Sequence, residues 1–166
     1  MSQFIRHLNQ IKSKRTVEWL TPSQQAALSS IRNALRIPAT VNLFGRAGVG
    51  KTFLGWTLAS ELDFAYLPQP DLINTVNGTE YDGVILDNCR AERQAHRELL
   101  KTLRFQDVGR AVIITRQTVQ DYTHFVELHL TTSDILTAQQ NLTGAGVLSI
   151  HRYEVPNLWY LVNLSL

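Results

Sequence analysis

Eight consecutive residues, 45 to 52, have the types and spacing needed to hold a phosphate chain. They read G-R-A-G-V-G-K-T and fit the Walker A pattern G-x-x-x-x-G-K-[ST]. Its glycines permit backbone angles that a side chain would forbid, so that N–H groups can turn toward phosphate oxygens. The nucleotide-binding residues predicted from the pattern are Gly45, Arg46, Ala47, Gly48, Val49, Gly50, Lys51, Thr52 and Phe53.

Lys51 and Thr52 add chemistry that an ordinary glycine-rich turn does not need. The ammonium of Lys51 can reach the outer phosphates of a nucleotide, and the hydroxyl of Thr52 can ligate a Mg²⁺ ion that bridges two phosphates. A short apolar run precedes the loop and an amphipathic segment follows it, which is the strand–loop–helix context that the motif requires. The sequence therefore predicts a site for ATP and Mg²⁺.

An acidic residue at the end of a second apolar run is typical of a Walker B motif. Val84, Ile85 and Leu86 precede Asp87, which we expect to hold the Mg²⁺ together with Thr52. The next residue is Asn88, whose amide can orient a water molecule but cannot accept its proton. Either hydrolysis is slow or another acid acts as the base, and the nearest acids in the sequence are Asp71 and Glu92.

A third apolar run, 111 to 114, is followed by Thr115 and Arg116. A hydroxyl at this place can contact the γ-phosphate and an arginine can offset its charge, so we include both among the catalytic residues with Lys51, Asp87 and Asn88. The alternative is a strand end that is merely solvated. Arg90, Arg93 and Arg97 could act on a neighbouring site in trans, but a solvated basic face is the favoured interpretation.

Apolar runs alternate with amphipathic segments along the chain, which predicts an α/β fold with a five-stranded, mainly parallel sheet between two helical layers. The expected strands are 41–44, 64–67, 84–87, 111–115 and 125–130, and the expected helices are 21–36, 53–62, 91–105 and 133–142, with a short helix at 71–76. The tail, 147–153 and 158–164, has an extended pattern that predicts a β-hairpin. We expect one compact domain: an N-terminal helical segment (1–40), a P-loop NTPase core (41–143) and the C-terminal hairpin (144–166).

The composition limits the class of protein. A chain of 166 residues with a net charge of +2 suits one globular domain and neither requires nor excludes nucleic acid. The single cysteine fits a reducing compartment, and no apolar run has the roughly twenty residues of a membrane span, so we expect a cytoplasmic protein with no membrane contact. The histidines form no metal-ligand pattern.

The first seventeen residues contain five basic or histidine side chains and no acid: Arg6, His7, Lys12, Lys14 and Arg15. A transit peptide can look like this. Phe4, Leu8 and Ile11 share one face at helical spacing, however, which favours a surface helix. The basic side of that helix could contact a phosphate backbone.

Residues 84–89, which read V-I-L-D-N-C, and the later V-I-I-T-R at 112–116 resemble the nucleotide-binding core of STAND signalling ATPases and their AAA+ relatives, in the additional-strand (ASCE) division of P-loop NTPases. The resemblance covers about residues 41 to 116. It implies ATP binding, a γ-phosphate sensor at Thr115 and Arg116, and nucleotide-controlled assembly. Residues 20–27 are similar to the segment that precedes Walker A in superfamily-1 helicases, which implies that Gln25 contacts adenine.

The winged-helix domain of STAND proteins and the second motor domain of helicases do not follow in this sequence, so a minimal module is expected that acts by self-assembly or through a partner protein. The leading hypothesis is a small ATPase that works as a switch. The alternatives are a small-molecule kinase with Asp71 near its substrate, a nucleic-acid-associated ATPase component of a mobile-element or defence system, and a nucleotide binder without turnover.

Overall fold

A single parallel sheet organises the computed structural model, which describes residues 3–78, 80–148 and 154–164. Its strand order is β2-β3-β4-β1-β5, and every pairing is parallel. The strands are β1 (Ala39–Phe44), β2 (Phe64–Leu67), β3 (Gly83–Leu86), β4 (Arg110–Ile114) and β5 (His124–Glu127). The insertion of β4 between β1 and β3 places the end of β4 beside the ends of both other strands. The predicted α/β class and five-stranded sheet are confirmed.

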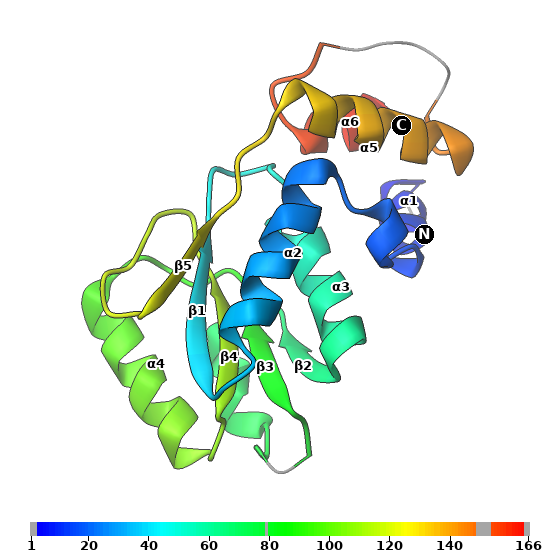
Figure 1. Ribbon diagram of the computed structural model, residues 1–166. Helices are drawn as coiled ribbons and strands as arrows, with labels where there is room; N and C mark the ends of the chain where they lie inside the picture. Colours follow the sequence, from blue (N-terminus) through cyan, green and yellow to red (C-terminus); the bar gives the residue numbers. More distant parts are fainter. Residues whose placement is uncertain (1–2, 79, 149–153, 165–166) are drawn as a thin grey trace.

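Helices cover both faces of this sheet, as Figure 1 shows. One face carries α2 (Pro22–Ala34) and α3 (Lys51–Leu62), and the other carries α4 (Arg93–Phe105) and the short 3₁₀ helix η2 (Pro70–Thr75). Alternate residues of β4 serve the two layers: Val112 and Ile114 pack under α2 and α3, and Ala111 and Ile113 pack under α4. This alternation is the period of two that a strand imposes, and it explains why β4 is apolar throughout.

The start of α2 shows why the sequence folds as predicted there. Pro22 occupies the first turn of α2, where its missing N–H costs nothing, and Thr21 takes the N-cap position. The side-chain carbonyl of Gln24 accepts a hydrogen bond from the backbone N–H of Thr21 at 2.9 Å. The side chain of Gln24 therefore helps to cap the helix in which it lies.

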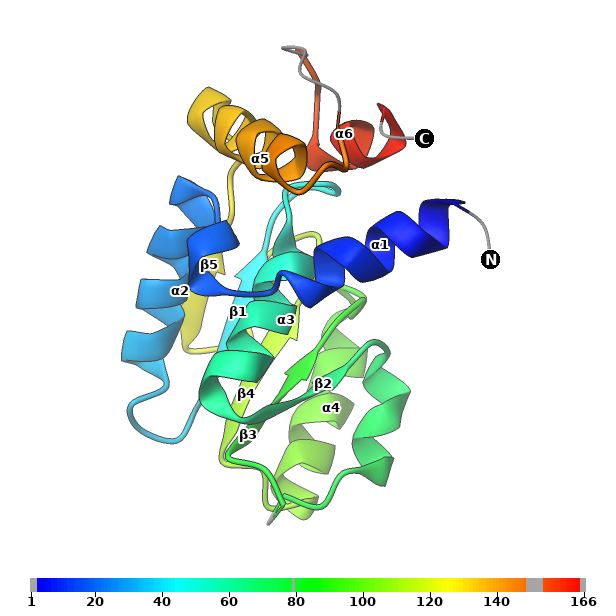
Figure 2. The ribbon, with the colours of Figure 1, turned by 90° about the vertical axis from the view of Figure 1, so that its right-hand side faces the viewer.

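Three helices lie apart from these layers, near the carboxyl ends of the strands (Figure 2): α1 (Gln3–Ser13), α5 (Thr132–Gly144) and α6 (Leu158–Leu164). They share a small apolar cluster centred on Leu161, to which Leu142, Val147 and Leu148 also belong. The expected helix at the N-terminus is confirmed by α1. The boundaries of most other elements differ by one to three residues. For example, β1 begins at Ala39, α3 at Lys51 and α4 at Arg93, and β5 ends at Glu127.

The predicted C-terminal hairpin is wrong in its second arm, because 158–164 form the helix α6. Leu158 and Leu161 are three residues apart, so helical spacing turns both toward α5 and the phosphate loop, whereas a strand would separate them onto opposite faces. Of the first arm, Val147 and Leu148 belong to no strand and pack in the apolar cluster, and 149–153 lie outside the described residues. Within the described chain, no helix has both the length and the hydrophobicity needed to cross a membrane.

Asp134 ties the start of α5 to the start of α2. Its carboxylate is fully buried and accepts hydrogen bonds from the backbone N–H and hydroxyl of Ser23 (2.8 and 2.7 Å) and from those of Thr131 (2.7 and 2.6 Å). Burial by itself raises the pKa of Asp134, but these hydrogen bonds outweigh it, so the pKa lies below its ordinary value. The charged form is therefore the one that the fold stabilises.

We expect Asp134→Asn to lower the free energy of unfolding at neutral pH by roughly 2–3 kcal/mol, because hydrogen bonds to a charged acceptor are lost. Since the folded-state pKa is lowered, this contribution is fully present above the ordinary aspartate pKa of about 4 and is lost as the pH falls toward the folded-state value. Urea unfolding of wild type and variant across this pH range measures the effect. The exposed carboxylate Asp82, changed to Asn, is the control, and an equal loss in both variants would contradict the assignment.

Candidate phosphate-binding site

The Walker A loop joins the end of β1 at Phe44 to the start of α3 at Lys51. Gly48 and Gly50 have φ values of 79° and 93°, which side chains rarely adopt. A Cβ atom on Gly50 would also lie 2.3 Å from the side-chain nitrogen of Gln24. Both positions therefore require glycine, and the loop leads its N–H groups to the amino end of α3, where anions bind favourably.

The ammonium of Lys51 is folded back into this loop. It donates to the carbonyl oxygens of Gly45 and Arg46 at 2.6 and 2.8 Å. Burial lowers the pKa of Lys51, the charge of Asp87 opposes this effect, and the nearby Arg116 adds to it. Phosphate oxygens that enter the loop would compete with two carbonyl oxygens for an ammonium that is already in place.

Asp87, Thr52 and Tyr66 meet beside the loop. One oxygen of the buried Asp87 carboxylate accepts from the Thr52 hydroxyl at 2.7 Å and from the Tyr66 hydroxyl at 2.6 Å. The other oxygen accepts from the backbone N–H of Asn88 at 2.7 Å. Burial, strengthened by Asp87, raises the pKa of Tyr66, so this hydroxyl keeps its proton and acts as a donor. Sequence reasoning missed Tyr66, because nothing in the run F-A-Y-L marks its tyrosine as polar and inward.

The donor set of Thr52 and Asp87 fits Mg²⁺, which prefers oxygen ligands and keeps part of its shell for phosphate and water. The described residues contain no group of three histidine, cysteine or acidic side chains that could hold a metal ion without such help. A Mg²⁺ ion at Thr52 and Asp87 would therefore take the rest of its ligands from bound phosphate and water.

Asn88 has φ 56°, in the left-handed region that asparagine tolerates better than most residues. Its side-chain N–H donates to the carbonyl of Pro68 at 3.0 Å, which fastens the amide to the end of β2. Asp71 and Glu92 were the predicted substitutes for a catalytic acid. Both are exposed, on η2 and at the start of α4, and neither lines the cavity beside the loop. Asp71 likewise gives the kinase alternative no structural support.

Thr115 and Arg116 follow β4 at the same edge of the sheet. The buried hydroxyl of Thr115 accepts from the side chain of Asn42 at 2.9 Å and donates to the carbonyl of Gln117 at 2.6 Å. Asn42 also accepts from the backbone N–H of Val119 at 3.0 Å, so it fixes the start of the loop after β4. Arg116 is exposed and lines the cavity. The lone asparagine in V-N-L-F was the signal for Asn42, which sequence reasoning did not use.

The glutamine that faces the loop is Gln24 and not the predicted Gln25. Gln25 is exposed and donates to the carbonyl of Leu20 at 3.2 Å. Gln24 is buried, lines the cavity and donates to the carbonyl of Gly50 at 2.9 Å. Neighbouring helical positions differ by about 100° in direction, so the pattern could place a glutamine near the site without telling which of two adjacent ones faces it.

A cavity of about 760 Å³ adjoins the loop, which lies in the usual range for ligand pockets. Lys51, Thr52 and Asp87 are among the residues that line it. Its apolar wall comes from segments far apart in the sequence, with Leu8 and Ile11 from α1, Trp19, and Leu142, Leu158 and Leu161 from α5 and α6. The backbone N–H of Leu158 donates to the carbonyl of Gly48 at 2.9 Å, so α6 contacts the phosphate loop directly.

No protein-family model matches this chain, and neither does any curated protein sequence. Solved structures with a similar fold include the replication initiator DnaA bound to AMPPCP and single-stranded DNA (TM-score 0.56, 10% identity, covering 85% of this chain and 58% of that one). The Holliday junction branch migration motor RuvB of Thermotoga maritima is also similar (TM-score 0.56, 17% identity, 86% and 58%). So is AMPPCP-bound DnaA from Aquifex aeolicus (TM-score 0.51, 12% identity, 76% and 52%).

These identities are low, so the likeness establishes the fold alone, a five-stranded parallel sheet between helical layers as in the P-loop NTPases DnaA and RuvB. The chain spans a little over half the length of the solved chains that it matches. It therefore corresponds to only a part of those proteins, and their activities as whole proteins are not carried over to this chain.

Proposed function

We propose that this chain is an ATP-binding P-loop ATPase that acts as a nucleotide-dependent switch or assembly module, with slow Mg²⁺-dependent hydrolysis. The observation that carries the proposal is that the Lys51 ammonium and the hydrogen-bonded pair Thr52–Asp87 line the same cavity, at the carboxyl edge of the sheet. The AMPPCP bound to DnaA in two similar structures supports an adenine nucleotide as the ligand.

Each residue then has a defined task. The N–H groups of the loop hold the phosphates, and Lys51 exchanges its two carbonyl partners for phosphate oxygens. Thr52 and Asp87 would hold Mg²⁺, which would supply charge neutralisation at the phosphates. Thr115 and Arg116 line the same cavity and would contact the γ-phosphate. The base would lie against the apolar wall to which α1, α5 and α6 contribute.

The switch depends on α6, because Leu158 bonds to the carbonyl of Gly48 in the phosphate loop. A nucleotide that reorders the loop would alter this bond and with it the position of α6. Two exposed aromatic side chains of α6, Trp159 and Tyr160, would then be presented differently to a second copy or to a partner protein.

Light scattering after size exclusion, in the apo, ADP and AMPPCP states, tests the switch, together with hydrogen exchange over α6. We expect the AMPPCP state to differ from the other two in mass or in the protection of α6. Identical profiles in all three states, with binding demonstrated separately, would leave nucleotide binding standing and remove the switch.

Asn88→Asp is expected to raise the rate of ATP hydrolysis by roughly 10-fold or more, since general bases contribute about 10²–10⁴-fold in rate. Aspartate tolerates the left-handed backbone of this position, and its carboxylate cannot donate to Pro68, so it is free to turn to the cavity. Steady-state phosphate release measures the change. Asn88→Gly is the control, because it keeps the backbone and adds no base; an equal gain in both variants would contradict the interpretation.

A nucleic-acid-associated ATPase component, of a mobile-element or defence system, is the second candidate. It is favoured by the exposed basic residues Arg6, Lys14 and Arg15 at the N-terminus, and by the single-stranded DNA bound to one similar DnaA structure. Lys12 of the same segment is turned toward Trp56, with its ammonium 5.5 Å from the ring centre, which leaves it less available to a phosphate. Binding of DNA that weakens steeply with salt would support this candidate.

A further inference from the structure

The exposed side of α4 carries a line of cations that the nucleotide site does not use. Arg93, Arg97, Lys101 and Arg104 follow one another at intervals of four, four and three residues, all exposed, so they share one face of the helix. At 1.5 Å per residue the line is about 16 Å long. The opposite face, with His96, Leu99 and Leu103, is buried against the sheet. The acid within α4, Glu98, lies beside the line and accepts from Gln94.

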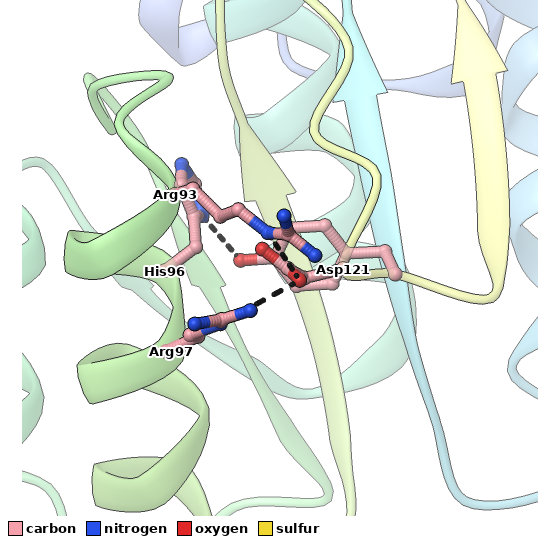
Figure 3. A network of polar contacts seen from close by, with 5 residues as sticks. Arg93, His96, Arg97 and Asp121 are labelled. Atoms are coloured by element: carbon pink, nitrogen blue, oxygen red, sulfur yellow. Dashed lines mark hydrogen bonds and ion pairs between the residues drawn. The ribbon is translucent and has the colours of Figure 1, made fainter.

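Two of these cations are held in place by Asp121 (Figure 3). One carboxylate oxygen of Asp121 lies 3.3 Å from Nε of Arg93 and 3.9 Å from Nε of Arg97, and its other oxygen is buried without a hydrogen-bond partner among the described residues. Both arginine side chains remain more than half exposed, at 67% and 60%. They are thus oriented and still open to a ligand, and they lose less conformational freedom when they bind.

The start of α4 is also fixed to the loops around it. The ring nitrogens of the buried His96 contact the hydroxyl of Tyr122 and the carbonyl of Arg90. Arg90 lines the nucleotide cavity, and Tyr122 follows Asp121 directly. The cations of α4 are therefore presented by a rigid element and not by a mobile loop.

Phe105 is the last residue of α4 and 87% of its surface is exposed. It directly follows Arg104, so a large apolar ring stands next to the line of cations. Aromatic rings beside cations are the means by which proteins bind single-stranded nucleic acid, because bases stack on the ring while phosphates meet the charges.

We propose that this α4 basic face, made of Arg93, Arg97, Lys101, Arg104 and Phe105, binds the phosphate backbone of single-stranded nucleic acid, with Phe105 stacked on an unpaired base. The proposal does not depend on nucleotide at the phosphate loop. It assigns the nucleic-acid contact to α4 and not to the N-terminal segment.

The test uses the full chain without nucleotide and a labelled oligothymidylate of about 16 nucleotides, titrated between about 50 and 200 mM salt. The double variant Lys101→Gln/Arg104→Gln is expected to bind roughly 10-fold more weakly, and to reduce the slope of log affinity against log salt by about 1.4, which is 0.7 for each of two charges. Phe105→Ala is expected to weaken binding by roughly 10-fold with the slope unchanged. Lys14→Gln/Arg15→Gln tests the N-terminal segment as the alternative contact. Arg32→Gln/Arg36→Gln, which removes two exposed cations outside both segments, is the matched control and should bind as wild type.

Three results would overturn the proposal. The first is that the wild-type protein fails to bind the oligonucleotide at about 50 mM salt. Loss of binding in the Lys14/Arg15 variant but not in the α4 variants is another. Phe105→Ala that binds as wild type would remove the stacked base. Equal melting temperatures of all variants confirm that the comparison is between folded proteins, since the substituted side chains are exposed.

Discussion

Lys51→Ala is expected to weaken ATP binding by roughly 100-fold or more, because the phosphate oxygens would lose the ammonium that lies within the partly desolvated loop. Burial lowers the pKa of Lys51, and the negative charge of Asp87 opposes this effect. Burial thus disfavours the charged ammonium, and the negative charge of a bound phosphate would favour it again. The two carbonyl oxygens that Lys51 now contacts, of Gly45 and Arg46, remain able to bind water in the variant.

Titration calorimetry with AMPPCP and Mg²⁺ measures this loss. Lys14→Ala, which removes an exposed lysine of the N-terminal segment, is the matched control and should leave the affinity unchanged. Equal melting temperatures for the two variants would exclude a folding defect. An affinity that Lys51→Ala does not change would refute the assignment of the loop.

Asp87→Asn is expected to keep nucleotide binding without metal and to lose most of the gain that Mg²⁺ brings, by roughly 100-fold, since a charged ligand of the ion contributes several kcal/mol. Asparagine has nearly the same shape, and its side-chain oxygen can still accept from the Thr52 and Tyr66 hydroxyls. Its amide nitrogen takes the place of the oxygen that accepts from the backbone N–H of Asn88, so that one hydrogen bond is lost together with the charge. The ratio of AMPPCP affinities with and without Mg²⁺ is the quantity to measure.

Tyr66→Phe is expected to have a smaller effect than Asp87→Asn. It removes one of the hydrogen bonds that orient Asp87 but leaves its charge. The ratio of AMPPCP affinities with and without Mg²⁺ should therefore fall by about 10-fold, as for other residues that orient metal ligands. Tyr81→Phe removes an exposed hydroxyl and is the control. If Asp87→Asn leaves the ratio at its wild-type value, the metal site is not at Asp87.

The parts of the fold that apolar runs define were predictable. Strands buried on both faces are mainly apolar, so β1, β3 and β4 were recognisable from composition. The glycine loop, the acid and the threonine that follow them, at Gly45, Asp87 and Thr115, marked the edge where ligands gather. The start of α2 was also predictable, because Thr21 is a good N-cap residue and Pro22 is tolerated in the first helical turn. The loop itself was the strongest signal, because its residue types have no other common use.

The parts that depend on distant contacts were not predictable. Whether 158–164 form a strand or a helix is decided by α5 and α1, against which Leu161 is buried, and a short apolar run suits either structure. The cavity wall joins α1 to α5 and α6, which no local pattern connects. Tyr66 and Asn42 act through hydrogen bonds to residues on neighbouring strands, Asp87 and Thr115, so their roles depend on strand order.

The most direct measurement for the central claim is a crystal structure of the chain with AMPPCP and Mn²⁺, in which anomalous scattering locates the metal. The account predicts a triphosphate within the loop from Gly45 to Thr52, Lys51 turned from the loop carbonyls to phosphate oxygens, and the metal beside the Thr52 hydroxyl and the Asp87 carboxylate. A nucleotide bound elsewhere, or a metal remote from both side chains while Lys51 keeps its bonds to Gly45 and Arg46, would contradict it.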